Sequence, residues 1–283
     1  MTTPVPEAPV PHDPIARRFE GKVAFITGAA RGQGRAEAVR LAAEGADVIA
    51  VDIAAQVPET QYPGSTPEDL AETVRLVEAL DRRIVASQTD IRDYDALKAA
   101  LDAGVAELGR LDVVIANAGT TTAARAWEID AAHWAEQIDT NLNGPFHTAK
   151  AAIPIMIEQG TGGAIVFTSS VAGLRGLPYL AGYVAAKHGV TGLAKTLANE
   201  LAEHRIRVNT VHPHGVQTGL TVPELFPMIS DASPALSTLY MGQLPDPVSQ
   251  ADDIAAAVAW LASNEARHVT GIQLPVDLGR TNR

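Results

Sequence analysis

The sequence contains no cysteine, and it also lacks a membrane-spanning run and an excess of basic residues. Without cysteine, its 283 residues cannot form disulfides, thiolate metal sites or a thiol nucleophile. No apolar run reaches about eighteen residues, so no transmembrane helix is expected. The chain has 22 Lys and Arg against 33 Asp and Glu, a net charge of −11. This charge argues against nucleic acid and anionic membranes as partners.

The N-terminal stretch lacks the basic and apolar regions of a secretory leader and is rich in proline. We expect residues 1–17 to form a flexible arm before a single domain of residues 18–283, because open α/β domains often reach this length. The hydrophobic share of 46% is enough for a sizeable core. Together with the lack of cysteine, these features lead us to expect a cytoplasmic protein.

Short apolar runs alternate with helix-patterned segments along the chain. Nearly continuous apolar runs are typical of strands covered on both faces. Thr66-Pro67 begins one intervening helix with a cap and a proline, and Ser249 is predicted to begin the last one. The pattern predicts an α/β single-domain Rossmann fold, a doubly wound seven-stranded parallel sheet with helices on both faces. The predicted strands are 22–27, 46–51, 83–88, 111–116, 163–168, 206–211 and 272–276.

Two connections are longer than a compact domain needs. Residues 53–66 separate the second strand from its helix, and residues 213–248 follow the sixth strand. Long loops in compact domains are usually functional or disordered. The apolar side chains of 213–248 favour a lid over a substrate, with a packing excursion or a subunit contact as the alternative.

A glycine-rich turn follows the first strand and opens into a helix. Gly28, Gly32 and Gly34 allow a tight turn and a close approach of the backbone to a pyrophosphate at the helix N-terminus. Asp52 ends the second strand, where a carboxylate accepts hydrogen bonds from a ribose 2′-hydroxyl and repels a 2′-phosphate. This favours NAD over NADP, although Arg31 in the turn could accept a phosphate.

Tyr183 and Lys187 are four residues apart on a predicted helix, so both side chains lie on one face. A nearby ammonium stabilises a phenolate, so we expect the pKa of Tyr183 to lie below its usual value of about 10 and the phenol to transfer protons. Ser170 lies upstream and could donate to a substrate oxygen. Tyr94 and Lys98 have the same spacing but no such context, and we expect no chemistry from them.

These motifs resemble those of the short-chain dehydrogenase/reductases over about residues 20–283. The one departure is His214, which stands where the family usually has the glycine after Pro213, and this puts the local backbone geometry in doubt. The resemblance implies NAD as cofactor. The implied catalytic residues are Asn141, Ser170, Tyr183 and Lys187. The implied cofactor-binding residues are Gly28, Arg31, Gly32, Gln33, Gly34, Asp52, Ile53, Asp90, Ile91, Asn117, Ala118, Gly119, Tyr183, Lys187, Pro213, Val216 and Thr218.

The resemblance also implies roles for the catalytic residues. The substrate oxygen lies between Ser170 and Tyr183, and Tyr183 removes its proton in oxidation or supplies it in reduction. Lys187 lowers the pKa of Tyr183 and binds the nicotinamide ribose, while Asn141 holds a water that links Lys187 to solvent. A homotetramer is implied, with helices near 141–158 and 183–203 and the C-terminal segment at its interfaces.

Residues 27–53, the insertion after Asp52 and residues 68–93 are similar to the mycofactocin-associated subfamily, which includes carveol-dehydrogenase-like enzymes. That similarity implies tightly held NAD, covered over its adenosine half by residues 53–66, and mycofactocin as an external redox partner. The predicted pocket walls, Thr120 to Ala123, Val171 to Leu180 and 213–248, are largely apolar. They favour a small hydrophobic secondary alcohol or ketone. A 3-ketoacyl-thioester reductase and a non-catalytic NAD-binding sensor stay as alternatives. We expect no metal site at His212 and His214, because no third ligand is near them in the sequence.

Overall fold

The computed structural model describes residues 17–220, 222, 225–232 and 234–282. The predicted arm of residues 1–17 lies outside this range, except for Arg17. Within it, seven parallel strands form one sheet in the order β3-β2-β1-β4-β5-β6-β7. The strands are β1 Val23–Thr27, β2 Asp47–Asp52, β3 Ile84–Gln88, β4 Val113–Ala116, β5 Gly163–Thr168, β6 Ile206–Pro213 and β7 Gln273–Val276. All seven predicted strands are confirmed, with ends that differ by at most two residues.

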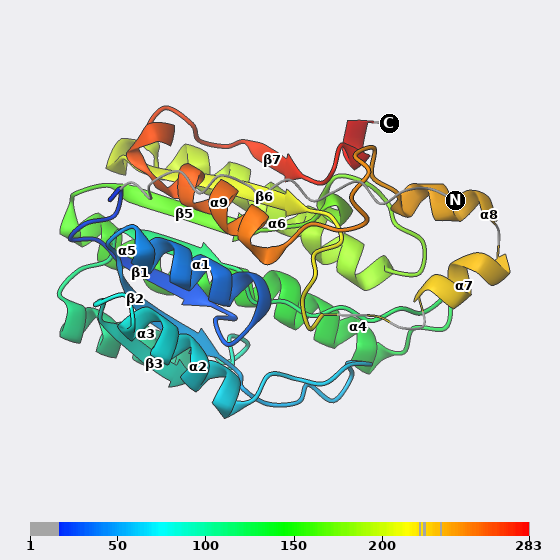
Figure 1. The fold of residues 1–283 in the computed structure, drawn as a ribbon, viewed down its shortest axis with the longest axis horizontal. Helices are drawn as coiled ribbons and strands as arrows, with labels where there is room; N and C mark the ends of the chain where they lie inside the picture. Colours follow the sequence, from blue (N-terminus) through cyan, green and yellow to red (C-terminus); the bar gives the residue numbers. More distant parts are fainter. Residues whose placement is uncertain (1–16, 221, 223–224, 233, 283) are drawn as a thin grey trace, which may run out of the picture.

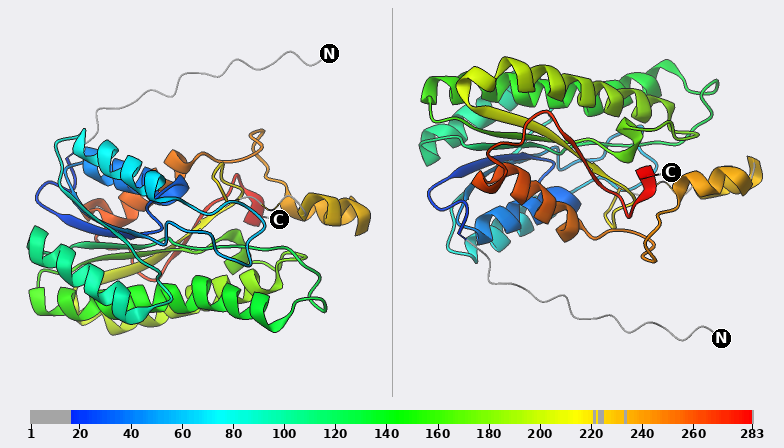
Figure 2. Two further views of the ribbon diagram at one scale, coloured as in Figure 1. Left: turned by 90° about the horizontal axis from the view of Figure 1, so that it is seen from below. Right: turned by 90° about the horizontal axis from the view of Figure 1, so that it is seen from above.

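Helices cover both faces of the sheet, as predicted (Figures 1 and 2). Helices α3, α5 and α6 cover one face, and α1, α2 and α9 cover the other. The main helices are α1 Gly32–Ala43, α2 Pro67–Glu78, α3 Tyr94–Leu108, α4 Ala131–Ile138, α5 Gly144–Gln159, α6 Ala181–Glu200 and α9 Ala251–Ala262. None of the described helices is long and apolar enough to cross a lipid bilayer.

The sheet separates two hydrophobic cores because successive side chains of a strand point to opposite faces. In β1, Val23 and Phe25 enter the core beneath α3, α5 and α6, whereas Ala24 and Ile26 enter the core beneath α1 and α9. A strand that is buried on both sides needs apolar residues at every position. The continuous apolar runs of the sequence therefore have a direct structural cause.

The start of α2 follows the prediction, and the start of α9 differs by one residue. Thr66 accepts a hydrogen bond from the amide of Asp69, whose side chain accepts one from the amide of Thr66 in return. In α9 the cap is Gln250 and not Ser249. The backbone of Ser249 is engaged elsewhere, because its N–H donates to Gly215 and its carbonyl accepts from Gln217.

The segment 213–248 contains short helices, where the sequence predicted a loop. They are α7 Leu225–Ala232, α8 Pro234–Ser237 and the 3₁₀ turn η4 Thr238–Tyr240. Helices α7 and α8 lie at one end of the molecule, beyond the carboxyl ends of the strands (Figure 1). The role of this segment as a lid stays a prediction.

The core beneath α3, α5 and α6 gives a testable prediction. Phe25 is fully buried in β1, so Phe25→Ala removes a ring that the neighbouring helices cannot replace. We expect the free energy of unfolding, measured by urea denaturation, to fall by about 3–5 kcal/mol. Leu80→Ala, at a position that is 38% exposed, is the control and should change it by about 0.5 kcal/mol. Equal losses in the two variants would contradict the two-core description.

Candidate active site

A cavity of about 310 Å³ lies at the carboxyl ends of the strands, where open α/β sheets bind ligands. It runs from the glycine turn after β1 to Tyr183 and Lys187 on α6. The predicted cofactor and catalytic residues that line it are Gly28, Arg31, Gly32, Gln33, Asp52, Ile53, Asp90, Ile91, Asn117, Ala118, Gly119, Ser170, Tyr183, Lys187, Pro213, Val216 and Thr218. The two predicted residues outside this lining are Gly34 and Asn141.

The glycine turn places backbone where side chains cannot fit. Gly28 and Gly32 have φ values of 69° and 57°, in the left-handed region. A Cβ at Gly28 would lie 2.7 Å from the Cα of Ala118, and one at Gly34 would lie 2.1 Å from the carbonyl oxygen of Gly28. Gly34 therefore serves the packing of α1 against the turn, and it does not face the cavity.

The glycine turn leaves one buried polar group without a partner. Gln33 lines the cavity, and its Oε1 atom has no hydrogen-bond partner among the described residues. Burying such a group without a partner is costly, so this position suits a polar ligand. Together with the bare backbone of Gly28 and Gly32, it fits the phosphate region of a dinucleotide.

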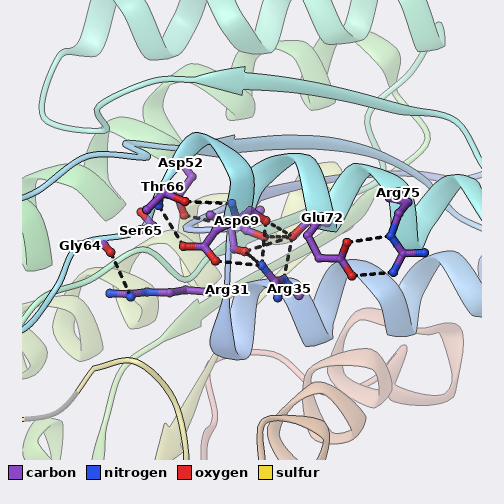
Figure 3. Close-up of polar contacts among 12 residues, drawn as sticks. Arg31, Arg35, Asp52, Gly64, Ser65, Thr66, Asp69, Glu72 and Arg75 are labelled. Carbon is purple, nitrogen blue, oxygen red and sulfur yellow. Dashed lines mark hydrogen bonds and ion pairs between the residues drawn. The ribbon is translucent and has the colours of Figure 1, made fainter.

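Asp52 joins β2 to the glycine turn and to the inserted segment (Figure 3). We call residues 53–66 the strap. One carboxylate oxygen of Asp52 accepts from the amide of Ala30 at 2.9 Å, and the other accepts from Ala54 at 2.9 Å and from the hydroxyl of Ser65 at 2.6 Å. The Asp52 side chain is thus buried, satisfied and fixed at the edge of the cavity.

Arg31 extends across to the strap (Figure 3). Its guanidinium donates to the carbonyl of Gly64 at 3.1 Å and to that of Pro63 at 2.6 Å. The alternative that Arg31 accepts a 2′-phosphate has to compete with these two contacts.

The strap also reaches the catalytic end of the cavity, which the sequence did not predict. The hydroxyls of Tyr62 and Thr120 form a hydrogen bond of 2.9 Å, and the Tyr62 oxygen accepts from the amide of Thr121 at 3.2 Å. Gln61 accepts from the amide of Ala123 at 3.2 Å. The only sequence signal for these contacts was an aromatic residue within a loop rich in proline and glycine.

Ser170, Tyr183 and Lys187 come together as predicted. Ser170 follows β5, accepts from the amide of Ala172 at 3.1 Å and contacts the Tyr183 hydroxyl. The ammonium of Lys187 lies 5.5 Å from the centre of the Tyr183 ring and donates to the carbonyl of Thr168 at 2.7 Å. Proton-bearing groups from β5 and α6 therefore converge at one point of the cavity.

The expected lowering of the Tyr183 pKa is wrong for the protein alone. Tyr183 is partly buried, and protein atoms crowd its phenol enough that desolvation raises its pKa to about 12, against the opposing effect of the Ser170 hydrogen bond. Burial also lowers the pKa of Lys187 to about 8. The ammonium lies beside the ring and is itself desolvated, so its field does not outweigh the loss of water around the phenol.

Asn141 lies behind Gly119, fully buried, in the π-helical turn η1 Asp139–Asn143. Its Oδ1 accepts from the amide of Thr120 at 3.0 Å, and its Nδ2 donates to the carbonyl of Gln137 at 2.9 Å. A Cβ at Gly119 would lie 2.9 Å from Asn141 Oδ1 and 3.5 Å from Lys187 Nζ. Gly119 therefore keeps open the short space between these two side chains.

Asn117 and Asp90 support the cavity from the ends of β4 and β3. The side-chain amide of Asn117 donates to the carbonyls of Thr27 and Gly28, so it holds the glycine turn as well as lining the cavity. Desolvation acts to raise the pKa of Asp90, but hydrogen bonds from Arg92 outweigh it and hold that pKa below its usual value. Arg92 also lines the cavity and contacts Glu136 on α4.

His212 and His214 point to different partners. The Nδ1 of His212 lies 2.6 Å from the Ser170 carbonyl and its Nε2 lies 2.7 Å from the Thr210 hydroxyl. His214 lines the cavity and contacts the buried guanidinium of Arg280. No three His, Cys, Asp or Glu side chains of the described chain gather as metal ligands would.

The unusual His214 causes no backbone strain. Among the described residues, those with a left-handed backbone do not include His214. Its amide donates to the carbonyl of Val276 and so extends the pairing of β6 with β7. The doubt about local geometry at this position is thereby removed.

An apolar cluster adjoins Tyr183. Tyr183 packs against it together with residues of the segment 213–248. Its buried members are Ala123, Val171, Ala172, Leu177 and Leu180, and its partly buried ones include Tyr179, Val184, Val222, Leu225, Met228 and Tyr240. The predicted pocket walls thus meet on one side of the phenol.

The comparison pair Tyr94–Lys98 lies away from the cavity. Lys98 forms an ion pair with Asp102, and the ammonium of Lys150 lies 4.3 Å from the centre of the Tyr94 ring. The same i,i+4 spacing therefore places Tyr94 and Lys98 on α3, outside the cavity lining, whereas Tyr183 and Lys187 line the cavity.

The short chain dehydrogenase family model matches residues 22–225. The chain is 44% identical over 275 residues to a (−)-trans-carveol dehydrogenase of Rhodococcus erythropolis, covering 93% of this chain and 99% of the relative. It resembles the crystal structure of an NAD-bound short chain dehydrogenase from Mycobacterium paratuberculosis, with a TM-score of 0.91, 49% identity, and coverage of 94% and 100% of the two chains. A carveol dehydrogenase from Mycobacterium avium in complex with NAD gives a TM-score of 0.88 and 50% identity over 94% and 99%.

The environment of His212 predicts a pH dependence of stability. Burial lowers its pKa from 6.5 to about 4, so between these values the unfolded chain binds more protons than the folded one. The free energy of unfolding should therefore fall as the pH falls from 6.5 to 4, by at most ~1.4 kcal/mol per pH unit from this group.

Urea denaturation of wild type and His212→Gln across this range tests the pH dependence, because the stability advantage of wild type should shrink toward pH 4. His188→Gln, at an exposed position, controls for the loss of a histidine as such. A pH-independent difference between wild type and His212→Gln would contradict the prediction.

Proposed function

Because the chain belongs to the short-chain dehydrogenase family, we propose that it is an NAD-dependent alcohol dehydrogenase or ketone reductase. Its substrate is a small hydrophobic secondary alcohol, of the kind that carveol represents, or the corresponding ketone. One observation carries this proposal: a single cavity connects the glycine turn and Asp52 with Ser170 and Tyr183, beside an apolar cluster.

Asp52 and Arg31 support NAD over NADP. The buried carboxylate of Asp52 lines the cavity and disfavours a 2′-phosphate beside it. The Arg31 guanidinium, the group that could have accepted such a phosphate, is occupied by carbonyl groups of the strap. Gly28, Gly32 and Gln33 would hold the pyrophosphate. When bound, NAD supplies the acceptor or the donor of the hydride.

Tyr183 is the acid–base group. It passes a proton to or from the substrate oxygen, which Ser170 holds in place by a hydrogen bond. A pKa of about 12 in the protein alone suits the phenol as proton donor in reduction. Oxidation needs the phenolate, so its rate rises with pH. Lys187 and Asn141 approach the same side of Gly119, and Asn141 would hold a water that links Lys187 to solvent. Acid–base help of this kind contributes roughly 10²–10⁴-fold.

The apolar cluster supports the substrate class. Two guanidinium groups lie near it, but both have partners within the chain: Arg175 donates to the carbonyl of Arg280 at 2.8 Å, and Arg280, 4.9 Å from the Tyr240 ring, contacts His214. A phosphopantetheine thioester calls for basic groups that are available to bind it. This favours an alicyclic or terpenoid alcohol over the 3-ketoacyl-thioester alternative.

The strap supports tightly held NAD. Its residues line the cavity, and it is fixed at Asp52 and Arg31 on one side and at Thr120 and Ala123 on the other. We propose that NAD stays bound between turnovers and that mycofactocin carries the electrons away. We also propose a cytoplasmic homotetramer, to which the exposed ring of Phe146 on α5 would contribute contact area.

The first test of the proposed function is Tyr183→Phe, which removes only the hydroxyl that transfers the proton. We expect turnover of a secondary alcohol such as carveol to fall below 1% of wild type, while bound NAD is unchanged. Reduction of bound NAD by the alcohol in a single turnover, followed by absorbance, measures the chemical step directly. Activity close to wild type in the variant would remove Tyr183 from the mechanism. No reduction in wild type with any secondary alcohol would favour the sensor alternative.

The second test concerns cofactor retention. Denaturing the purified protein should release close to one NAD(H) per chain into the supernatant, measured by chromatography. Turnover should then depend on an added electron acceptor more than on added NAD. Protein that purifies empty and turns over freely with added NAD would contradict the retention of NAD and the role of mycofactocin.

A further inference from the structure

Tyr62 connects the strap to the catalytic end of the cavity. Its side chain is 8% exposed and lines the cavity, although it comes from a segment that begins at the opposite end, beside Asp52. Its hydroxyl meets the Thr120 hydroxyl at 2.9 Å and accepts from the Thr121 amide at 3.2 Å. One buried phenol thus fixes both the side chain and the backbone of the segment that follows β4.

Thr120 passes this constraint to Asn141. The amide of Thr120 donates to Asn141 Oδ1 at 3.0 Å, so the hydroxyl of Tyr62 is two hydrogen bonds away from the Asn141 carboxamide. Beside this pair, a Cβ at Gly119 would lie within 3.5 Å of both Asn141 Oδ1 and Lys187 Nζ, so the two side chains approach the same side of Gly119. Hydrogen bonds in a buried chain of this kind strengthen one another, so they favour one geometry of the Asn141 carboxamide.

The rest of the strap is fixed by contacts that do not reach the catalytic side chains, such as those of Gln88 with Ile53 and Ala54 and of Gln56 with Thr60 and Gly64. It contains no regular helix or strand. At the Asp52 end it is held by the Ser65 hydroxyl and by the Arg31 guanidinium, and Gln61 makes a contact with Ala123. Tyr62 is therefore the strap residue whose hydrogen bonds lead to a predicted catalytic side chain. Tyr62 and Tyr183 both line the cavity.

We propose that Tyr62 is a positioning residue for the proton relay, acting on Asn141 through Thr120. Closure of the strap over the cavity and alignment of Asn141 with Lys187 are then one event. The inference rests on the proposed function, because it takes from there a water, held by Asn141, that links Lys187 to solvent. Tyr62 itself does not transfer a proton.

The test compares Tyr62→Phe with wild type, since this change removes the hydroxyl and keeps the ring. We expect kcat for a secondary alcohol to fall about tenfold, KM to stay within about twofold, and bound NAD to be unchanged. The solvent deuterium isotope effect on kcat should rise, because proton exchange becomes slower relative to the other steps. A purely structural contribution of Tyr62 would not change that isotope effect.

Two further variants identify the path. Thr120→Val removes the hydroxyl that meets Tyr62. The double variant Tyr62→Phe/Thr120→Val should have a kcat no lower than that of the slower single variant, because the effects of two residues that act through one hydrogen bond do not add. Tyr94→Phe, at a tyrosine on α3 away from the cavity, is the matched control and should behave as wild type. Additive losses in the double variant would overturn the proposed path through Thr120.

Amide hydrogen exchange provides a readout that needs no turnover. In Tyr62→Phe, exchange at Thr121 should accelerate because its amide loses the acceptor. Exchange at Thr120 should also accelerate, because the Thr120 side chain loses the contact that holds the residue against Asn141. Unchanged exchange, or unchanged kcat and isotope effect, would overturn the inference. A fall in kcat that is fully explained by a lower content of bound NAD would overturn it as well, because Tyr62 would then act only in retaining the cofactor. Failure of wild type to oxidise any secondary alcohol would instead contradict the proposed function, while the exchange experiment still decides the positioning.

Discussion

The buried carboxylate of Asp52 is the contact on which the cofactor side of the molecule depends. It accepts from Ala30 in the glycine turn, from Ala54 at the start of the strap and from Ser65 near its end. A buried carboxylate is tolerated only while hydrogen bonds replace its lost water. The turn, the end of β2 and both ends of the strap therefore keep their relative positions. The residue proposed to select NAD is thus also a structural link between three segments.

Much of the fold could be predicted because its signals are local. A strand buried on both faces must be apolar at every position, and this requirement appears directly in the sequence at runs such as that of β1. The glycine turn and the spacing of Tyr183 and Lys187 are also local patterns. The start of α9 was misplaced by one residue because Ser249 has a backbone partner in the segment after β6, which no local pattern reveals.

The parts of the site that could not be predicted depend on distant contacts and on water. Tyr62 and Thr120 are 58 positions apart, and nothing in either segment alone indicates that they meet. The i,i+4 spacing placed Tyr183 and Lys187 on one face, but it could not tell how much water remains around the phenol. Burial dominates there, so the pKa of Tyr183 is raised although its lysine is in the expected place. His214 departs visibly from the family pattern, but its buried partner Arg280 comes from the C-terminal segment, 66 positions away.

The π-helical turn at Asn141 has a consequence for the helix that contains it. Helices α4 and α5 are continuous through η1, and a π turn holds about one residue more than an α turn. Residues beyond it are therefore rotated by about 100° relative to an unbroken α-helix. Before the turn, α4 packs against α6, where Gln137 lies next to Gly182. After it, the helix follows a different phase, which lets Ala149 and Ala152 face the sheet. The change of phase at η1 therefore lets one continuous helix pack against α6 in its first part and against the sheet in its second part.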